Sequence, residues 1–112
     1  MSLIYKIVSH AAWTAAQAAG RFDGVEIDLK DGYIHLSTGA QAAETARRHF
    51  AGVEGLVLVA YEADALPGVK WEPSRGDDLF PHVYGVLDPA RALSVTPLSL
   101  NAAGWPDPGE LA

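Results

Sequence analysis

The chain has 112 residues, eight Lys and Arg against fourteen Asp and Glu (net charge −6), and 49% hydrophobic residues, which suits one folded domain and excludes a disordered chain. Its scattered basic residues disfavour a nucleic-acid partner, because binding to a polyanion needs clustered Lys and Arg. The absence of cysteine excludes a disulfide framework, a Cys-ligated zinc site and a thiol nucleophile.

The first half of the chain predicts two longer strands and two helices. Ser9 suits the N-cap of an alanine-rich helix that Gly20 closes. Thr38 and Gln41 have the spacing of a capping box, so a second helix is expected to start there. The expected order is a strand at 4–8, a helix at 11–19, a short strand or loop at 25–27, a strand at 33–37 and a helix from 39 to about 50.

The second half predicts mostly strands. Residues 56–61 form a near-continuous apolar run, which is typical of a strand covered on both faces. Further strands are expected at 69–72, 79–85 and 91–98, with a polar loop at 74–78. We therefore expect an α+β fold with a single domain over residues 1–100. Residues 101–112 predict an irregular tail that Trp105 pins to the domain.

The first candidate site lies in the segment from Asp31 to Thr38. In a strand, Tyr33, His35 and Ser37 would share one face, because side chains alternate. The strand leads into a capped helix, whose N-terminal amides favour anions. A histidine and hydroxyls in this position suit a phosphate or ribose ligand. The alternative is a surface histidine, with Ser37 and Thr38 serving only as caps.

The second candidate site is the segment FPHVYG at residues 80–85. Alternation places Phe80, His82 and Tyr84 on one face of the predicted strand. A histidine between two aromatic rings suits a pocket in which a ligand stacks. The alternative is a half-buried histidine that is satisfied by a backbone carbonyl.

The third candidate is the pair Trp71 and Glu72. A carboxylate beside an indole can have a raised pKa, as a general acid or base requires. The alternative is an ordinary ion pair between Glu72 and Arg75.

Other polar residues give weaker signals. Two histidines at helix ends and two acidic residues near turns are interpreted as structural: His10, His49, Asp28 and Asp31. His35, His82 and Glu72 are of the types that bind zinc, but their spacing does not predict a site, so no metal is expected.

Four segments of the chain resemble a known family: IYKI at 4–7, DGYIHLST at 31–38 with Gln41, WE at 71–72 and FPHVYG at 80–85. Over residues 3–98 the chain resembles the bacterial family catalogued as domain of unknown function 952. That family is in turn similar to the ADP-ribosyltransferase fold. The resemblance implies two small, mostly antiparallel sheets around a cleft that binds NAD.

The resemblance also implies roles for individual residues. His35 would contact the ribose of NAD and belong to the catalytic residues, and Ser37 would shape the nicotinamide side of the cleft. Tyr84 would stack on the ligand, with Tyr61 as a second candidate, and Glu72 would be the catalytic carboxylate. The cofactor site would be completed by Thr38, Arg75, Phe80 and His82.

Two functions follow from the resemblance. One is NAD-dependent ADP-ribosyl transfer or a related cleavage of a glycosidic bond. The other is a module that binds a nucleotide or small anion without chemistry, because Glu72 precedes Tyr84 and the strand at 91–98 has no carboxylate. A plainer alternative is an interaction protein whose histidines are incidental.

The expected partner is therefore a small-molecule nucleotide, and neither a nucleic acid nor a membrane is expected. The sequence shows no signal peptide and no apolar stretch of membrane-spanning length, which indicates a soluble cytoplasmic protein. It leaves the oligomeric state open.

Overall fold

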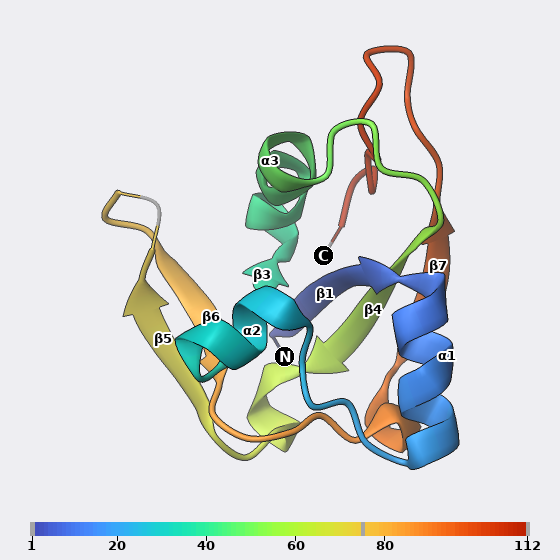
Figure 1. The fold of residues 1–112 in the computed structure, drawn as a ribbon. Coiled ribbons are helices and arrows are strands. Elements are labelled where there is room, and N and C mark those ends of the chain that lie inside the picture. Colours follow the sequence, from blue (N-terminus) through green and yellow to red (C-terminus); the bar gives the residue numbers. More distant parts are fainter. Residues whose placement is uncertain (1, 75, 112) are drawn as a thin grey trace.

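The computed structural model describes residues 2–74 and 76–111, which form two antiparallel sheets and three α-helices (Figure 1). The strands are β1 (Leu3–Ser9), β2 (Ile34–His35), β3 (Ser37–Thr38), β4 (Leu56–Glu62), β5 (Val69–Pro73), β6 (Leu79–Val83) and β7 (Ser94–Leu98). The helices are α1 (His10–Ala19), α2 (Glu26–Asp31) and α3 (Gly39–His49). Strand order is β3-β1-β4-β7 in the larger sheet and β2-β6-β5 in the smaller. This confirms the predicted α+β class.

The centre of the larger sheet is formed by β1 and β4, whose side chains are buried on both faces. On one face, Ile4 and Val59 pack with Trp13 of α1. On the other face, Leu58 packs in a second cluster with Ala46 of α3. The prediction of a strand at 56–61 that is covered on both sides is therefore confirmed. No helix in the described ranges is long and apolar enough to cross a bilayer.

Both predicted helix N-caps are confirmed. Ser9 Oγ accepts a hydrogen bond from Ala12 N at 3.0 Å and starts α1. Thr38 Oγ1 accepts from Gln41 N at 3.2 Å, while Gln41 Oε1 accepts from Thr38 N at 3.1 Å. This reciprocal pair starts α3 directly at the end of β3.

The prediction of a strand or loop at residues 25–27 is wrong, because the helix α2 begins at Glu26. The Asp28 side chain reaches back to the start of this helix, where its Oδ2 accepts a hydrogen bond from Val25 N at 2.9 Å. This capping bond satisfies a backbone donor that would otherwise lack a partner. α2 thus places Asp28 and Asp31 beside His35 of the smaller sheet.

The predicted strand at 33–37 is interrupted at Leu36, and its halves join different sheets. His35 in β2 lies opposite His82 of β6, whereas Ser37 in β3 lies opposite Tyr5 of β1. Leu36 N donates to Pro81 O at 3.1 Å between these two pairings. This short segment therefore connects the two sheets directly.

The last predicted strand is shorter than expected, and the tail that follows β7 packs onto the domain. A 3₁₀ turn occupies Pro89–Arg91, so β7 starts only at Ser94. In the tail, Leu100 and Pro106 form an isolated bridge. Trp105 packs against the apolar cluster beneath α3.

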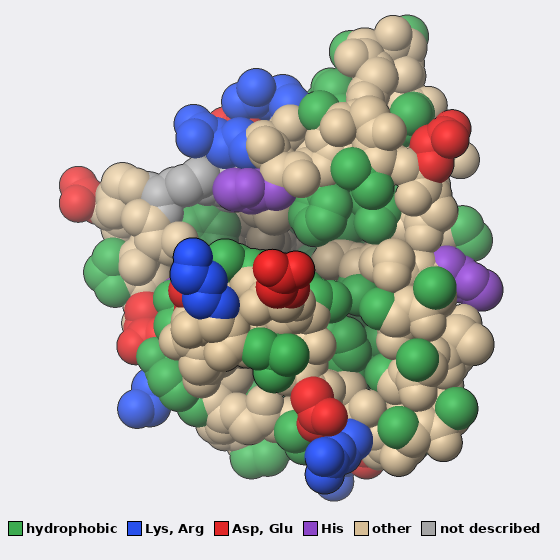
Figure 2. Space-filling view, viewed as in Figure 1, with side chains coloured by type: hydrophobic (Ala, Val, Ile, Leu, Met, Phe, Trp, Pro, Cys, Tyr) green, Lys and Arg blue, Asp and Glu red, His purple; other side chains and the backbone are tan. Residues whose placement is uncertain are grey.

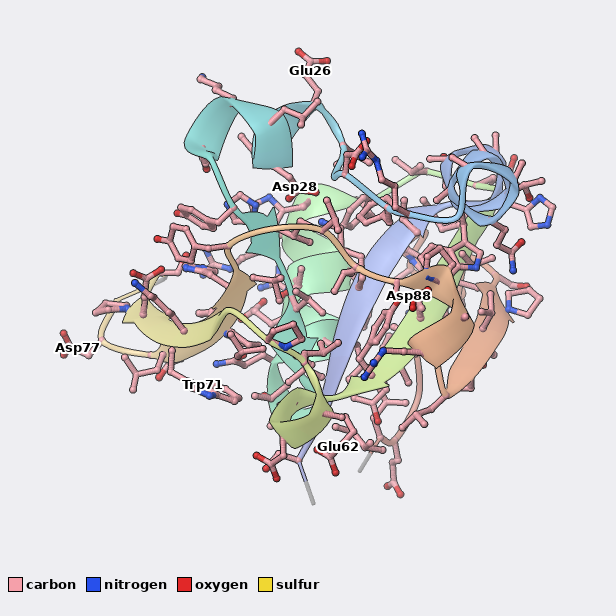
Figure 3. All side chains as sticks on the ribbon, turned by 90° about the horizontal axis from the view of Figure 1, so that it is seen from below. Glu26, Asp28, Glu62, Trp71, Asp77 and Asp88 are labelled. Carbon is pink, nitrogen blue, oxygen red and sulfur yellow. The ribbon has the colours of Figure 1, made fainter. Side chains whose placement is uncertain are left out.

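The two faces of the smaller sheet have different characters. Ile34 and Val83 point into the main core. His35, His82 and Glu72 occupy the opposite, polar face, which α2 approaches. Figure 3 shows the Asp28 side chain directed from α2 toward this face, whereas Glu26 points away from it. A polar site is therefore assembled beside α2.

We expect Gly68→Ala to destabilise the protein more than Gly52→Ala. The two glycines have φ values of +78° and +77°, so alanine costs about 1–2 kcal/mol at either position. Only at Gly68 would the new Cβ meet a backbone atom, Tyr84 O, at 2.7 Å. We expect this overlap to lower the free energy of unfolding by about a further 1–3 kcal/mol. Urea denaturation of the two variants measures the difference. Equal losses in the two variants would contradict the close approach.

Candidate functional site

A pocket of about 650 Å³, which we call the inter-sheet pocket, lies between β1, the smaller sheet and α3. Much of its wall is apolar and includes Ile7, Phe50 and Phe80. Its polar lining residues are Lys6, Ser9, His35, Ser37, Thr45, His49, Ser74 and His82. Figure 2 shows the hollow in the face between α2 and α3, with a histidine and basic side chains along its α3 edge.

One wall of the pocket is built around a buried ion pair between Lys6 and Asp28. Lys6 Nζ lies 2.9 Å from Asp28 Oδ2, and both side chains are almost fully buried. Burial alone would raise the pKa of Asp28, but the Lys6 ammonium and hydrogen bonds from His35 and Val25 outweigh it and lower that pKa. Burial also lowers the pKa of Lys6, and Asp28 opposes that shift. Each charge therefore depends on the other.

His35 is held between two carboxylates of α2. Its Nδ1 lies 2.7 Å from Asp28 Oδ1, and its Nε2 lies 3.0 Å from Asp31 Oδ2. The His35 backbone is fixed as well, because its N donates to Asp28 and its carbonyl oxygen accepts from Lys6 Nζ. The ring and backbone of His35 are thus tied to α2 and β1 at once.

A second imidazole–carboxylate pair lies on the neighbouring strands. Glu72 Oε1 accepts a hydrogen bond from His82 Nδ1 at 2.8 Å and another from Tyr84 OH at 2.8 Å. These two bonds lower the pKa of Glu72. The interpretation of Glu72 as a carboxylate whose pKa an indole raises is therefore wrong. Trp71, its neighbour on β5, projects from the other face of the sheet (Figure 3).

The Tyr33 ring connects the two pairs. Its centroid lies 4.2 Å from that of His82 and 4.7 Å from that of His35. The two imidazoles are themselves 5.5 Å apart in an edge-to-face arrangement. The structure therefore brings together His35 and His82, which come from separate motifs in the sequence.

The other candidate residues fall into three groups. Ser37 and Phe80 line the pocket with the two histidines. Glu72, Tyr84 and Thr38 lie outside its lining, with Thr38 serving as the cap of α3. Arg75 falls outside the described residues. Tyr61 is buried in the core and donates to Asp88 O, so it offers no face to a ligand, and the interpretation of Tyr61 as a stacking residue is wrong.

Four residues of this site were not predicted from the sequence. Asp28 and Asp31 were interpreted as turn residues, but both bind His35, and His49 lines the pocket. Lys6 carried a usable signal, since it shares a strand face with Ile4 and Val8. A lysine on a core-facing stripe requires a buried carboxylate as its partner. Within the described ranges, no three His, Asp or Glu side chains form a set that could hold a metal ion.

We expect Asp28 to make the protein acid-sensitive. Its pKa is lower in the folded state than in the unfolded chain, so its contribution to stability is present above about pH 4. That contribution is lost as the pH falls through the folded pKa, because the folded state then has to protonate a paired carboxylate. Unfolding free energies measured from pH 7 to pH 3 should show this decline in the wild type. In Asp28→Asn, this part of the pH dependence should be missing. If the unfolding free energy of Asp28→Asn depends on pH as that of the wild type does, Asp28 is not the group responsible.

The chain is similar to a known family and to solved structures. The profile of the family described as Protein of unknown function (DUF952) matches residues 7–95. The crystal structure of protein CC0527 from Caulobacter crescentus is 50% identical, covers 96% of each chain and has a TM-score of 0.94. The solution structure of CC0527 is 51% identical over 95% of this chain and 92% of that one, with a TM-score of 0.85. No curated protein matches significantly. The chain therefore belongs to the DUF952 family.

Proposed function

We propose that the protein binds a small nucleotide-type ligand, with NAD and ADP-ribose as the first candidates, in the inter-sheet pocket. The observation that carries this proposal is the composition of the pocket wall. Among the described residues that line it, three are histidines, one is a lysine, four carry Ser or Thr hydroxyls, and none is acidic. A protein with a net charge of −6 thus keeps carboxylates out of this lining.

This lining suits a ligand that combines an apolar ring with anionic and hydroxyl groups. Phe50 and Phe80 provide aromatic surface for a base or similar ring. His49 lies at the α3 edge with Arg47 and Arg48 next to it in the chain, where basic side chains favour a phosphate. The volume of about 650 Å³ lies within the range of small-molecule sites.

Binding without chemistry is the form of the proposal that the geometry supports best. ADP-ribosyl transfer would place a carboxylate beside the ribose, where positive charge develops. Glu72 lies outside the pocket lining, and its Oε1 already accepts bonds from His82 and Tyr84. The support is therefore stronger for a nucleotide-binding module than for a transferase.

Titration calorimetry with NAD, ADP-ribose and AMP tests the proposal, and two histidine variants make it specific. His49→Ala removes a pocket residue, and we expect it to weaken binding by about three- to tenfold, the loss of one or two hydrogen bonds. His10→Ala is the matched control, because His10 is exposed at the start of α1 and does not line the pocket. If the folded protein shows no heat of binding with any of the three ligands, the proposal is rejected.

A further inference from the structure

Two of the three histidines that line the inter-sheet pocket, His35 and His82, lie opposite each other on neighbouring strands, but they differ in what they can offer a ligand. Both ring nitrogens of His35 face carboxylates, with Nδ1 at 2.7 Å from Asp28 and Nε2 at 3.0 Å from Asp31. A carboxylate only accepts hydrogen bonds, so each of these contacts needs a proton on the ring nitrogen that faces it. The hydrogen-bonding capacity of His35 is then used up within the protein.

His82 is arranged differently. The pKa of Glu72 is lowered, so its carboxylate accepts and His82 Nδ1 is the donor of their 2.8 Å bond. His82 Nε2 makes no hydrogen bond to any residue in 2–74 or 76–111. The residue is 2% exposed and yet lines the pocket. Tyr33 covers the ring at 4.2 Å, which leaves the ring edge for contact with a ligand.

We propose that His82, and not His35, is the imidazole that binds the ligand of the inter-sheet pocket, through Nε2. In this arrangement Glu72 and Tyr84 are positioning residues. Glu72 holds the proton on Nδ1, and Tyr84 holds Glu72 through the same carboxylate oxygen. His35 is a fixed part of the wall, which differs from the ribose contact that the ADP-ribosyltransferase resemblance implies.

This inference rests on the proposed nucleotide function and narrows the ligand. An Nε2 without a proton accepts a hydrogen bond, so the ligand group facing it must be a donor. A ribose hydroxyl or a carboxamide N–H meets this need, whereas a phosphate oxygen does not. The phosphate is then expected toward His49, at the α3 edge of the pocket, and a ribose toward His82.

The ring tautomers can be measured without any ligand. In long-range ¹H–¹⁵N NMR spectra at pH 8, His82 should be the Nδ1–H tautomer with an unprotonated Nε2. In Glu72→Ala, the preference of His82 for Nδ1–H should weaken, because its acceptor is gone. An Nε2–H tautomer of His82 in the wild type would overturn the proposal.

A matched pair of variants tests the ligand contact. Asparagine retains a donor near the position of Nδ1 and removes Nε2, so the same change can be made at both histidines. His82→Asn should weaken ADP-ribose binding at least about tenfold, and His35→Asn less than about threefold. If His35→Asn loses more affinity for ADP-ribose than His82→Asn does, the proposal is overturned. If His82→Asn does not fold, Glu72→Ala replaces it, and unchanged affinity in that variant counts against the proposal.

Failure of the proposed function and failure of the inference about His82 can be distinguished. If the wild type binds none of NAD, ADP-ribose or AMP, the proposed function fails, and the tautomers alone decide whether His82 offers Nε2 to the pocket. If ADP-ribose binds but His82→Asn binds it equally well, the function stands and the inference about His82 falls.

Discussion

Replacing Asp28 with asparagine is expected to lower the free energy of unfolding by about 3–5 kcal/mol, the usual cost of removing one partner from a buried ion pair. The change leaves the ammonium of Lys6, a residue that is 5% exposed, without its charge partner Asp28. It also weakens the acceptor of hydrogen bonds from Val25 N and from the His35 ring and backbone. Urea denaturation at pH 7 measures the loss.

Asp31→Asn is the matched control for this prediction. Asp31 belongs to the same helix and also binds His35, but its side chain is 35% exposed. We expect that change to cost less than about 1 kcal/mol, as is usual for partly exposed pairs. In the double variant Lys6→Met/Asp28→Asn, the loss should be smaller than in Asp28→Asn alone, because no unpaired charge remains. Equal costs for Asp28→Asn and Asp31→Asn would contradict the central role of Asp28.

The second large effect is expected on ligand affinity when the pocket is obstructed. Val53 lines the inter-sheet pocket and is 40% exposed, so tryptophan at this position can occupy the pocket without entering the core. We expect Val53→Trp to weaken ADP-ribose binding at least about tenfold, which corresponds to about 1.4 kcal/mol. Titration calorimetry gives the value.

Val95→Trp is the control for bulk and hydrophobicity. Val95 has the same exposure of 40% but lies on β7 and does not line the pocket. Both variants should retain the wild-type circular dichroism spectrum. If Val53→Trp binds ADP-ribose as well as Val95→Trp does, the ligand lies elsewhere.

The sequence predicted those elements whose signals are local. The capping box of Thr38 and Gln41 and the apolar run at 56–61 each lie within a few residues, and both are confirmed. The helix α2 was missed because it has six residues and its apolar side chains, Ile27 and Leu29, are exposed. No apolar periodicity marks such a helix.

The site was harder to predict because its contacts join distant segments. Alternation correctly placed Phe80 and His82 on one strand face, but the partner of His82 is set by the pairing of β5 with β6. The pKa of Glu72 follows from that pairing and not from its neighbour Trp71. In the same way, Lys6 and Asp28 are 22 residues apart and meet only because α2 folds over β1 and β2.

The proposed function puts a nucleotide-type ligand in the inter-sheet pocket. Its most direct test is a titration of ¹⁵N-labelled protein with ADP-ribose, followed by amide NMR spectra. We expect saturable shifts that are largest at residues 35–37, 45–50 and 80–82, which surround the pocket. Shifts that cluster around α1 and β7 instead, or spectra unchanged at millimolar ligand, would contradict the claim.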